Sequence, residues 1–135
     1  MAKVLVIDDD GAIVRLILKV LSGRGHLVVV ARDGKSGLAR VASEKPELVI
    51  VDSDLPKIDG AEVCRNIKED PATANVPVIM MTPHYVDYYG REETLAPNAI
   101  VVRPFTREVL ANAVERALGG IGPRQAAQRR AQTAY

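Results

Sequence analysis

Acidic side chains follow two apolar segments of this chain, at the point where each segment ends. Residues 48–51 (LVIV) lead into Asp52, and residues 3–7 (KVLVI) lead into the aspartate run at 8–10. Short apolar runs rich in β-branched residues predict strands that are buried on both faces. Open α/β sheets place ligands at the carboxyl ends of such strands. Asp52 alone would fit an ordinary strand end, so a functional interpretation requires the two strands to be neighbours.

Several carboxylates at one sheet edge repel each other, and a hard divalent cation such as Mg²⁺ offsets that repulsion. A carboxylate beside the cation can act as a nucleophile and form an acyl phosphate. Thr82 and Arg103 follow two later apolar segments, so both are expected at the same edge. A hydroxyl donor and a cation there could contact phosphoryl oxygens. Together these residues predict a site for phosphoryl transfer to aspartate.

The elements that must position this site alternate along the chain. Alternation of strands and helices predicts a parallel sheet with right-handed crossovers and helices on both faces. A doubly wound, flavodoxin-like order 2-1-3-4-5 places the first and third strands side by side, which brings Asp8, Asp9 and Asp52 together. The expected strands are residues 3–7, 27–31, 48–51, 76–81 and 99–102, and the five expected helices are 12–22, 34–44, 61–69, 84–95 and 107–118.

The composition fits a single soluble globular domain. Of the 135 residues, 47% are apolar and 26% are charged, and the net charge of +1 argues against a general nucleic-acid or membrane surface. The one cysteine, Cys64, excludes an internal disulfide and favours a reducing compartment. The amino terminus enters a strand directly, and no apolar run approaches the roughly 18 residues of a membrane helix. A cytoplasmic location is therefore expected.

The carboxyl-terminal residues depart from the alternating pattern. We expect a folded domain over residues 1–118, followed over 119–135 by a linker or a disordered basic tail that is rich in Gly, Gln, Ala and Arg. No DNA-reading unit such as a helix-turn-helix fits into this segment. The protein is thus expected to act through a protein partner, with no direct contact to nucleic acid or membrane.

The motifs VLVIDDD, PELVIVDSDLPKIDG, VPVIMMT and VVRPF occur in this order. In sequence and spacing they resemble the receiver domain of bacterial response regulators (CheY-like) from about residue 3 to residue 118. The resemblance implies that Asp52 is the phosphoacceptor and that Asp8 and Asp9 hold Mg²⁺, with the backbone carbonyl of Asp54 completing the metal site. It also implies that Thr82 moves toward the phosphoryl group.

Other implications of the resemblance concern the surroundings of the site and the partners. Pro56 and Gly60 would shape the pocket, and the Arg103–Pro104 peptide bond resembles one that is usually cis. The phosphoryl group would come from a sensor histidine kinase, a phosphotransfer protein or a small donor. Phosphorylation would reshape the face made by residues 84–95, 99–102 and 107–118, which engages a downstream protein, a detached output domain or a second copy in a phosphorylation-linked homodimer.

Three positions depart from the family pattern. Arg103 replaces the usual lysine, Pro83 replaces a small residue after the threonine, and Ile100 replaces the switch aromatic. Two interpretations therefore stay open: a phosphorylatable receiver with a modified output face, and a pseudo-receiver that binds partners independently of phosphate. In either case the chain would be no enzyme beyond self-phosphotransfer and autodephosphorylation. A nucleotide- or flavin-binding protein is disfavoured because no G-x-G-x-x-G loop follows the first strand.

Overall fold

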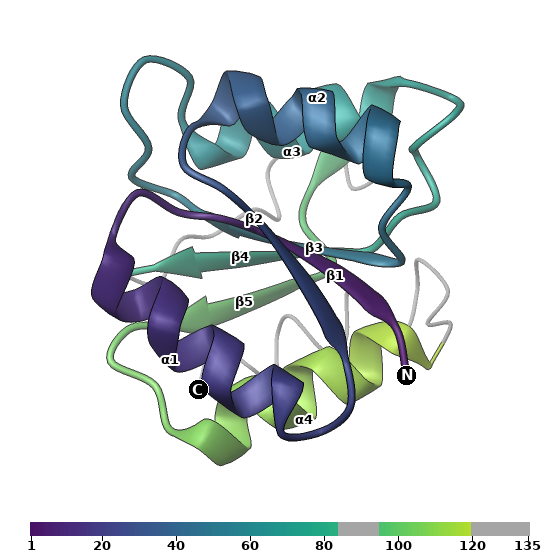
Figure 1. Ribbon diagram of the computed structural model, residues 1–135. Helices are drawn as coiled ribbons and strands as arrows, with labels where there is room; N and C mark the ends of the chain where they lie inside the picture. Colours follow the sequence, from purple (N-terminus) through teal and green to yellow (C-terminus); the bar gives the residue numbers. More distant parts are fainter. Residues whose placement is uncertain (84–94, 120–135) are drawn as a thin grey trace.

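A computed structural model describes residues 1–83 and 95–119 of the chain (Figure 1). The expected helix over 84–95 and the expected tail fall almost entirely outside these residues. No helix within the two described ranges is long and apolar enough to cross a membrane. The ranges contain the strands β1 (Lys3–Ile7), β2 (Leu27–Ala31), β3 (Leu48–Asp52), β4 (Val78–Thr82) and β5 (Ala99–Val102), and the helices α1 (Gly11–Ser22), α2 (Gly34–Glu44), α3 (Gly60–Glu69) and α4 (Arg107–Leu118).

The strands form one parallel sheet in the order β2-β1-β3-β4-β5, as the sequence predicted. In the ladder between β1 and β3, Ile7 lies opposite Val51, so the residues that follow both strands lie side by side. Helices α1 and α4 cover one face of the sheet, and α2 and α3 cover the other (Figure 1). The chain therefore has the doubly wound α/β fold expected from its alternating pattern.

Two large apolar clusters, one on each face of the sheet, form most of the core. Val6, Ile50 and Ile79 point toward α1 and α4, whereas their neighbours Leu5, Val49 and Val78 point toward α2 and α3. Every residue of β3 and β4 is buried, because both faces of these central strands are covered. Burial of each large aliphatic side chain contributes roughly 1.5–3 kcal/mol. Continuous apolar runs without alternation are the sequence signature of such strands.

The fourth strand begins later and ends later than predicted. The sequence indicated residues 76–81, whereas β4 begins at Val78. The backbone N–H of Val76 donates to the carbonyl of Thr73 (2.9 Å) and completes a turn, and Pro77 has no N–H to contribute to a ladder. The strand extends through Thr82, which pairs in register with Val102 of β5.

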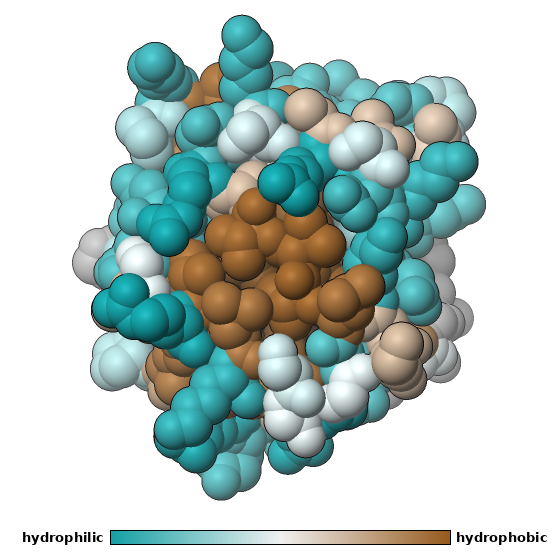
Figure 2. All heavy atoms as spheres, viewed as in Figure 1, coloured by the Kyte–Doolittle hydropathy of each residue, from teal (hydrophilic) through white to brown (hydrophobic). Residues whose placement is uncertain are grey.

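Strand β2 lies at one edge of the sheet and leaves apolar side chains in contact with solvent. Leu27 is 53% exposed, and Val28, Val29 and Val30 are half-buried. Figure 2 shows a hydrophobic surface over this edge, framed by hydrophilic residues. The three valines pack against the apolar clusters on the two faces, so this strand closes the core as well as the sheet.

Candidate functional site

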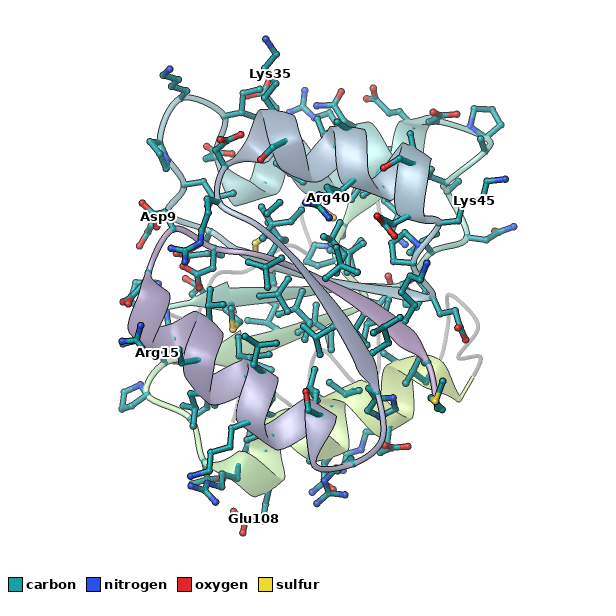
Figure 3. The ribbon with its side chains drawn as sticks, viewed as in Figure 1. Asp9, Arg15, Lys35, Arg40, Lys45 and Glu108 are labelled. Atoms are coloured by element: carbon teal, nitrogen blue, oxygen red, sulfur yellow. The ribbon has the colours of Figure 1, made fainter. Side chains whose placement is uncertain are left out.

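Three carboxylates converge where β1 and β3 end. One carboxylate oxygen from each of Asp8, Asp9 and Asp52 lies within 4.8 Å of the others. Asp8 and Asp52 are buried, whereas Asp9 is exposed in the loop between β1 and α1 (Figure 3). The predicted convergence of the two strand ends is therefore confirmed, and its cause is the adjacency of β1 and β3 in the sheet.

Local hydrogen bonds explain the orientation of the first acidic run. The backbone N–H of Asp10 donates to Oδ1 of Asp8 (2.9 Å), which fixes the buried carboxylate against the turn that follows β1. Asp10 itself caps helix α1, because its Oδ1 accepts the backbone N–H groups of Ala12 (2.9 Å) and Ile13 (3.4 Å). Of the three consecutive aspartates, two thus face the site and one starts the helix.

The carboxyl group of Asp8 has a raised pKa. Burial raises the pKa of its carboxyl from the ordinary 3.8 to about 6, and the negative charge of Asp52 adds to the increase. The bond from Asp10 and the charge of Arg103 act in the opposite direction. The second oxygen of Asp8, Oδ2, is buried and has no hydrogen-bond partner within the described part of the chain.

These features fit a hard divalent cation. A buried acceptor without a donor is costly in free energy, and a cation would satisfy it. The ligand set that the site offers consists of carboxylate oxygens, which Mg²⁺ prefers in proteins. Asp8, Asp9 and Asp52 are therefore the residues that could hold Mg²⁺ here.

Arg103 reaches this acidic cluster from the end of β5. Its Nη2 donates to Oδ1 of Asp52 (2.9 Å) and lies 3.8 Å from Oδ2 of Asp54. The side chain of Asp52 is 4% exposed and that of Arg103 is 19% exposed, so their contact is largely shielded from water. Oδ1 of Asp52 also accepts the backbone N–H of Asp54 (3.1 Å). The arginine thus joins the acidic site, as its position after the fifth strand predicted.

Thr82 lies at the same sheet edge, at the end of β4. Thr82 is buried, and its backbone carbonyl accepts the N–H of Arg103 (2.8 Å), which ties the ends of β4 and β5 together. The peptide bond between Arg103 and Pro104 is cis, in agreement with the resemblance noted above. Ile100 is 3% exposed and packs with Ala96, so the residue at the switch position is an apolar core side chain.

Gly60 allows the start of α3 to approach the backbone of Asp52. A Cβ atom at this position would lie 2.8 Å from both the carbonyl carbon of Asp52 and Cα of Ser53. The N–H of Gly60 donates to the carbonyl of Ser53 (3.1 Å). Only a residue without a side chain fits this approach, which explains why the loop after Asp52 ends in glycine.

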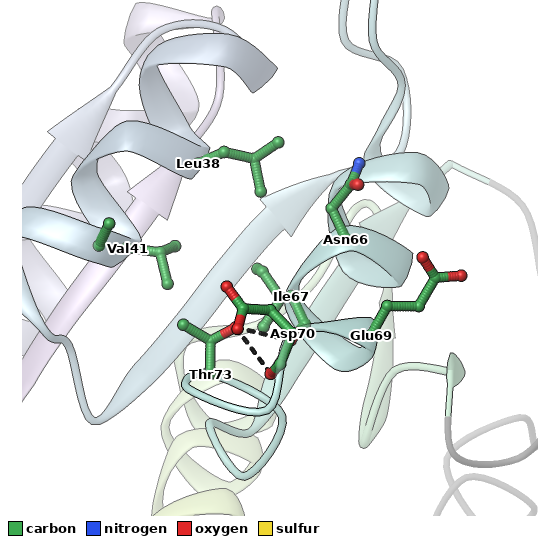
Figure 4. A pocket seen from close by; sticks show the side chains of 8 residues that line it. Leu38, Val41, Asn66, Ile67, Glu69, Asp70 and Thr73 are labelled. Atoms are coloured by element: carbon green, nitrogen blue, oxygen red, sulfur yellow. Dashed lines mark hydrogen bonds between the residues drawn. The ribbon is translucent and has the colours of Figure 1, made fainter.

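A separate cavity of about 400 Å³ lies between α2 and α3 (Figure 4). Two of its polar side chains are engaged in local structure: the hydroxyl of Thr73 donates to the carbonyl of Ile67 (2.7 Å), and Oδ1 of Asp70 accepts the N–H of Ala72 (2.9 Å). We assign no chemistry to this cavity. It is lined by Leu38, Val41, Ala42, Asn66, Ile67, Glu69, Asp70 and Thr73.

Comparison with known proteins gives a consistent result. The sequence model of the family described as the response regulator receiver domain matches residues 4–115. The chain is similar to the response regulator PleD of Caulobacter vibrioides, with 40% identity over 81 residues, 60% of this chain and 18% of PleD. It is also similar to the alkaline phosphatase synthesis transcriptional regulatory protein PhoP of Bacillus subtilis, with 39% identity over 80 residues, 59% of this chain and 32% of PhoP. The match thus spans less than a third of either relative.

Among solved structures, the chemotaxis response regulator CheY4 of Vibrio cholerae has a TM-score of 0.80 to this chain. The two share 25% sequence identity, and the match covers 87% of this chain and 98% of that chain. A putative response regulator from Chloroflexus aurantiacus also has a TM-score of 0.80, with 27% identity and coverage of 87% and 98%. The likeness thus extends over almost the whole of both solved chains.

Proposed function

Because the chain belongs to the family of response regulator receiver domains, we propose that it accepts a phosphoryl group on Asp52 in a Mg²⁺-dependent reaction. One observation supports this proposal most directly: the buried Asp52 carboxylate lies within a cluster of acidic residues and forms an ion pair with an arginine side chain. Asp8 and Asp9 lie on one side of it, and Arg103 donates to it at 2.9 Å. No such arrangement is needed to stabilise the fold, since buried like charges are costly.

In the proposed reaction a carboxylate oxygen of Asp52 forms a bond to the phosphorus of the donor. The bond between phosphorus and the donor breaks, and the leaving group departs with the electron pair and takes a proton from the donor side or from solvent. The N–H of Asp54 and the guanidinium of Arg103 orient the carboxylate, and the hydroxyl of Thr82 would donate to a phosphoryl oxygen.

Mg²⁺ held by Asp8, Asp9, Asp52 and the backbone carbonyl of Asp54 would supply the positive charge that lets two anions approach. The chain's own contribution is to hold the oxygen ligands in place before the ion arrives. Asp8 is already fixed by its bond from Asp10, and Asp52 by its bonds from Arg103 and Asp54. The phosphorylated carboxylate would then lose phosphate by hydrolysis, so the protein turns over no external substrate.

The donor would be a sensor histidine kinase or a phosphotransfer protein in the cytoplasm. The signal would leave through residues 84–95, strand β5 and the last helix, α4, toward a protein partner or an output domain. Val109 on α4 is 44% exposed, so this helix presents an apolar side chain to solvent. The membership in the receiver family supports this route.

A phosphorylation-independent binding module is the second candidate. It is favoured by Ile100, which is buried and has no polar tip that could report a change at Asp52. Pro83 also removes a backbone N–H directly after Thr82. In this case the acidic site would be retained without being used for signalling.

Intact mass spectrometry after incubation with acetyl phosphate, with and without Mg²⁺, tests the proposal. The expected result is a single phosphoryl adduct that requires Mg²⁺ and is absent in Asp52→Asn. Folding of the variant can be verified by circular dichroism, since the chain has no tryptophan. A folded wild-type protein that forms no adduct would favour the phosphorylation-independent module.

A further inference from the structure

The outer edge of β2 combines unpaired backbone groups with solvent-exposed apolar side chains. Within residues 1–83 and 95–119, β2 pairs with β1 on one side and with no strand on the other. Such an edge presents N–H and C=O groups on which another strand can form. Native proteins often blunt an edge strand with charged side chains or proline, whereas β2 has the sequence LVVVA. This edge is therefore a candidate interaction surface.

The ladder with β1 shows which backbone groups of β2 face outward. The N–H of Leu27 donates to the carbonyl of Ala2 (2.9 Å), so Leu27 directs its polar groups toward the inner side of the strand. The backbone groups of successive strand residues point to opposite sides. The N–H and C=O of Val28 and Val30 therefore face the free edge, whereas those of Val29 face β1.

Apolar side chains accompany these backbone groups. Leu27 is 53% exposed, and the three valines that follow it are half-buried. Figure 2 shows the resulting hydrophobic surface near the centre of the view, surrounded by hydrophilic residues. A strand that paired with β2 would remove part of this apolar surface from water while its backbone completed the edge.

The segments around β2 are strongly basic. Residues 11–45 contain seven basic side chains, all exposed, and two acidic ones, although the whole chain has a net charge of only +1. Both acidic side chains are engaged locally. Asp33 caps α2, and Glu44 forms ion pairs with Lys3 (3.3 Å) and Arg40 (3.7 Å). The apolar edge is therefore bordered by positive charge.

Two of the basic side chains converge near the carboxyl end of β2. Arg32 follows the strand, and Arg15 lies on α1 (Figure 3). A Cβ atom on Gly11 would lie 3.4 Å from Nη1 of Arg15 and 3.8 Å from Nη1 of Arg32, so both guanidinium groups lie over the start of α1. Neither forms an ion pair within the described part of the chain; Asp9 belongs to the acidic cluster, and Asp10 caps α1. Two adjacent guanidinium groups favour a carboxylate between them.

We propose that β2 binds an extended segment of a partner protein, rich in acidic and apolar residues, which adds to the sheet as a further strand. Its backbone pairs with the N–H and C=O groups of Val28 and Val30, and its apolar side chains cover Leu27 and the valines. One of its carboxylates lies between Arg15 and Arg32. This surface is separate from the phosphoacceptor, and binding to it does not require phosphorylation.

Charge and backbone geometry decide against other occupants. Residues 119–135 contain three arginines and no acidic residue, so the basic border would repel them. A second copy in a symmetric contact would bring two basic borders together. A lipid surface offers no regular array of donors and acceptors that matches a strand edge, whereas another polypeptide backbone does.

A direct test uses the wild-type chain without Mg²⁺ or phosphodonor. The probe is a short peptide, capped at both ends, in which valine and glutamate alternate, and ¹H–¹⁵N spectra report its binding residue by residue. We expect the N–H signals of Val28 and Val30 to shift and to exchange more slowly with water. The N–H of Val29 should exchange at an unchanged rate, because it already faces β1. Equal slowing at all three valines, or no slowing at any of them, would overturn the added strand.

The charge requirement is tested by the double variant Arg15→Glu with Arg32→Glu, and Arg65→Glu on the exposed side of α3 is the matched control. The double variant should bind the valine–glutamate peptide about threefold to tenfold more weakly, and the control should differ from wild type by less than about twofold. A peptide that alternates valine and lysine should show the opposite preference. Equal affinity of the double variant and wild type for the valine–glutamate peptide would refute recognition of an acidic segment.

Two measurements address the other occupants. Sedimentation equilibrium of the unphosphorylated wild-type chain should show a monomer, whereas a dimer with slowed exchange at Val28 and Val30 would assign the edge to a second copy and overturn the proposal. Flotation with vesicles of phosphatidylserine and phosphatidylcholine should show no binding. Vesicle binding that is lost in the double variant, by a protein that does not bind the peptide, would assign the surface to lipid and likewise overturn it.

Discussion

Replacement of Asp8 by asparagine should stabilise the metal-free protein, and the gain should grow as the pH rises. In the folded state burial raises the pKa of Asp8 to about 6, whereas in the unfolded chain the carboxyl ionises near 3.8. Between these values the unfolded state has released its proton and the folded state still holds it. The free energy of unfolding of the wild-type protein is therefore highest with respect to this group below about pH 3.8, where Asp8 is protonated in both states. It falls as the pH rises through about 6.

The size of the effect follows from the same values. A pKa difference of about two corresponds to about 3 kcal/mol, since one pKa unit is about 1.4 kcal/mol. An asparagine at this position stays neutral, and its amide oxygen can still accept the N–H of Asp10. Asp8→Asn should therefore exceed wild type in unfolding free energy by about 3 kcal/mol near pH 7.5 and by about half of that near pH 5.

Urea unfolding followed by far-ultraviolet circular dichroism in the presence of EDTA measures this difference at both pH values. Asp9→Asn is the matched control, because it is the same substitution in the same run at an exposed side chain. Its effect should stay below about 1 kcal/mol. If Asp8→Asn is no more stable than wild type at the higher pH, or if the gain is the same at both pH values, the buried charge of Asp8 does not lower the unfolding free energy of the wild-type protein.

Three further predictions concern the same site. Mg²⁺ should raise the melting temperature of the wild-type protein more near pH 7.5 than near pH 5, because Asp8 must be ionised to bind it, and calorimetry that shows equal shifts would contradict this. Gly60→Ala should cost about 1–3 kcal/mol in urea unfolding and slow adduct formation, since the new Cβ overlaps the backbone of Asp52; an unchanged rate in a folded variant would speak against that contact. Asp54→Asn should change the lifetime of the acyl phosphate, because its carboxylate lies beside Arg103 and adds negative charge near the phosphoryl group; an equal lifetime by mass spectrometry would count against this role.

Much of the architecture could be predicted because its signals are local. The bounds of β1, β2 and β5 agree with the sequence, since short runs dominated by apolar, mostly β-branched residues favour strands. The start of β4 was wrong by two residues because the turn bond between Val76 and Thr73 outweighs the strand preference of the valine. The helix expected over 84–95 stays a prediction.

The acidic residues of the site were also within reach of sequence reasoning. Strand ends mark the edge where ligands bind, so the sequence alone groups Asp8, Asp9 and Asp52. The roles assigned to them stay predictions that the experiments above address. The separate role of Asp10 as a helix cap depends on the direction of its side chain, which the spacing of the run does not reveal.

By itself, then, the sequence determined where the five strands lie to within about two residues, which carboxylates lie at their ends, and that the two acidic ends must meet if β1 and β3 are neighbours. Tertiary structure alone decided how those groups interact. The burial that raises the pKa of Asp8 and the 2.9 Å contact between Arg103 and Asp52 both arise between strands that are far apart in the chain. The physical reason is that burial and hydrogen-bond geometry depend on packing between strands, whereas the apolar runs that mark the strands are formed by residues adjacent in the sequence.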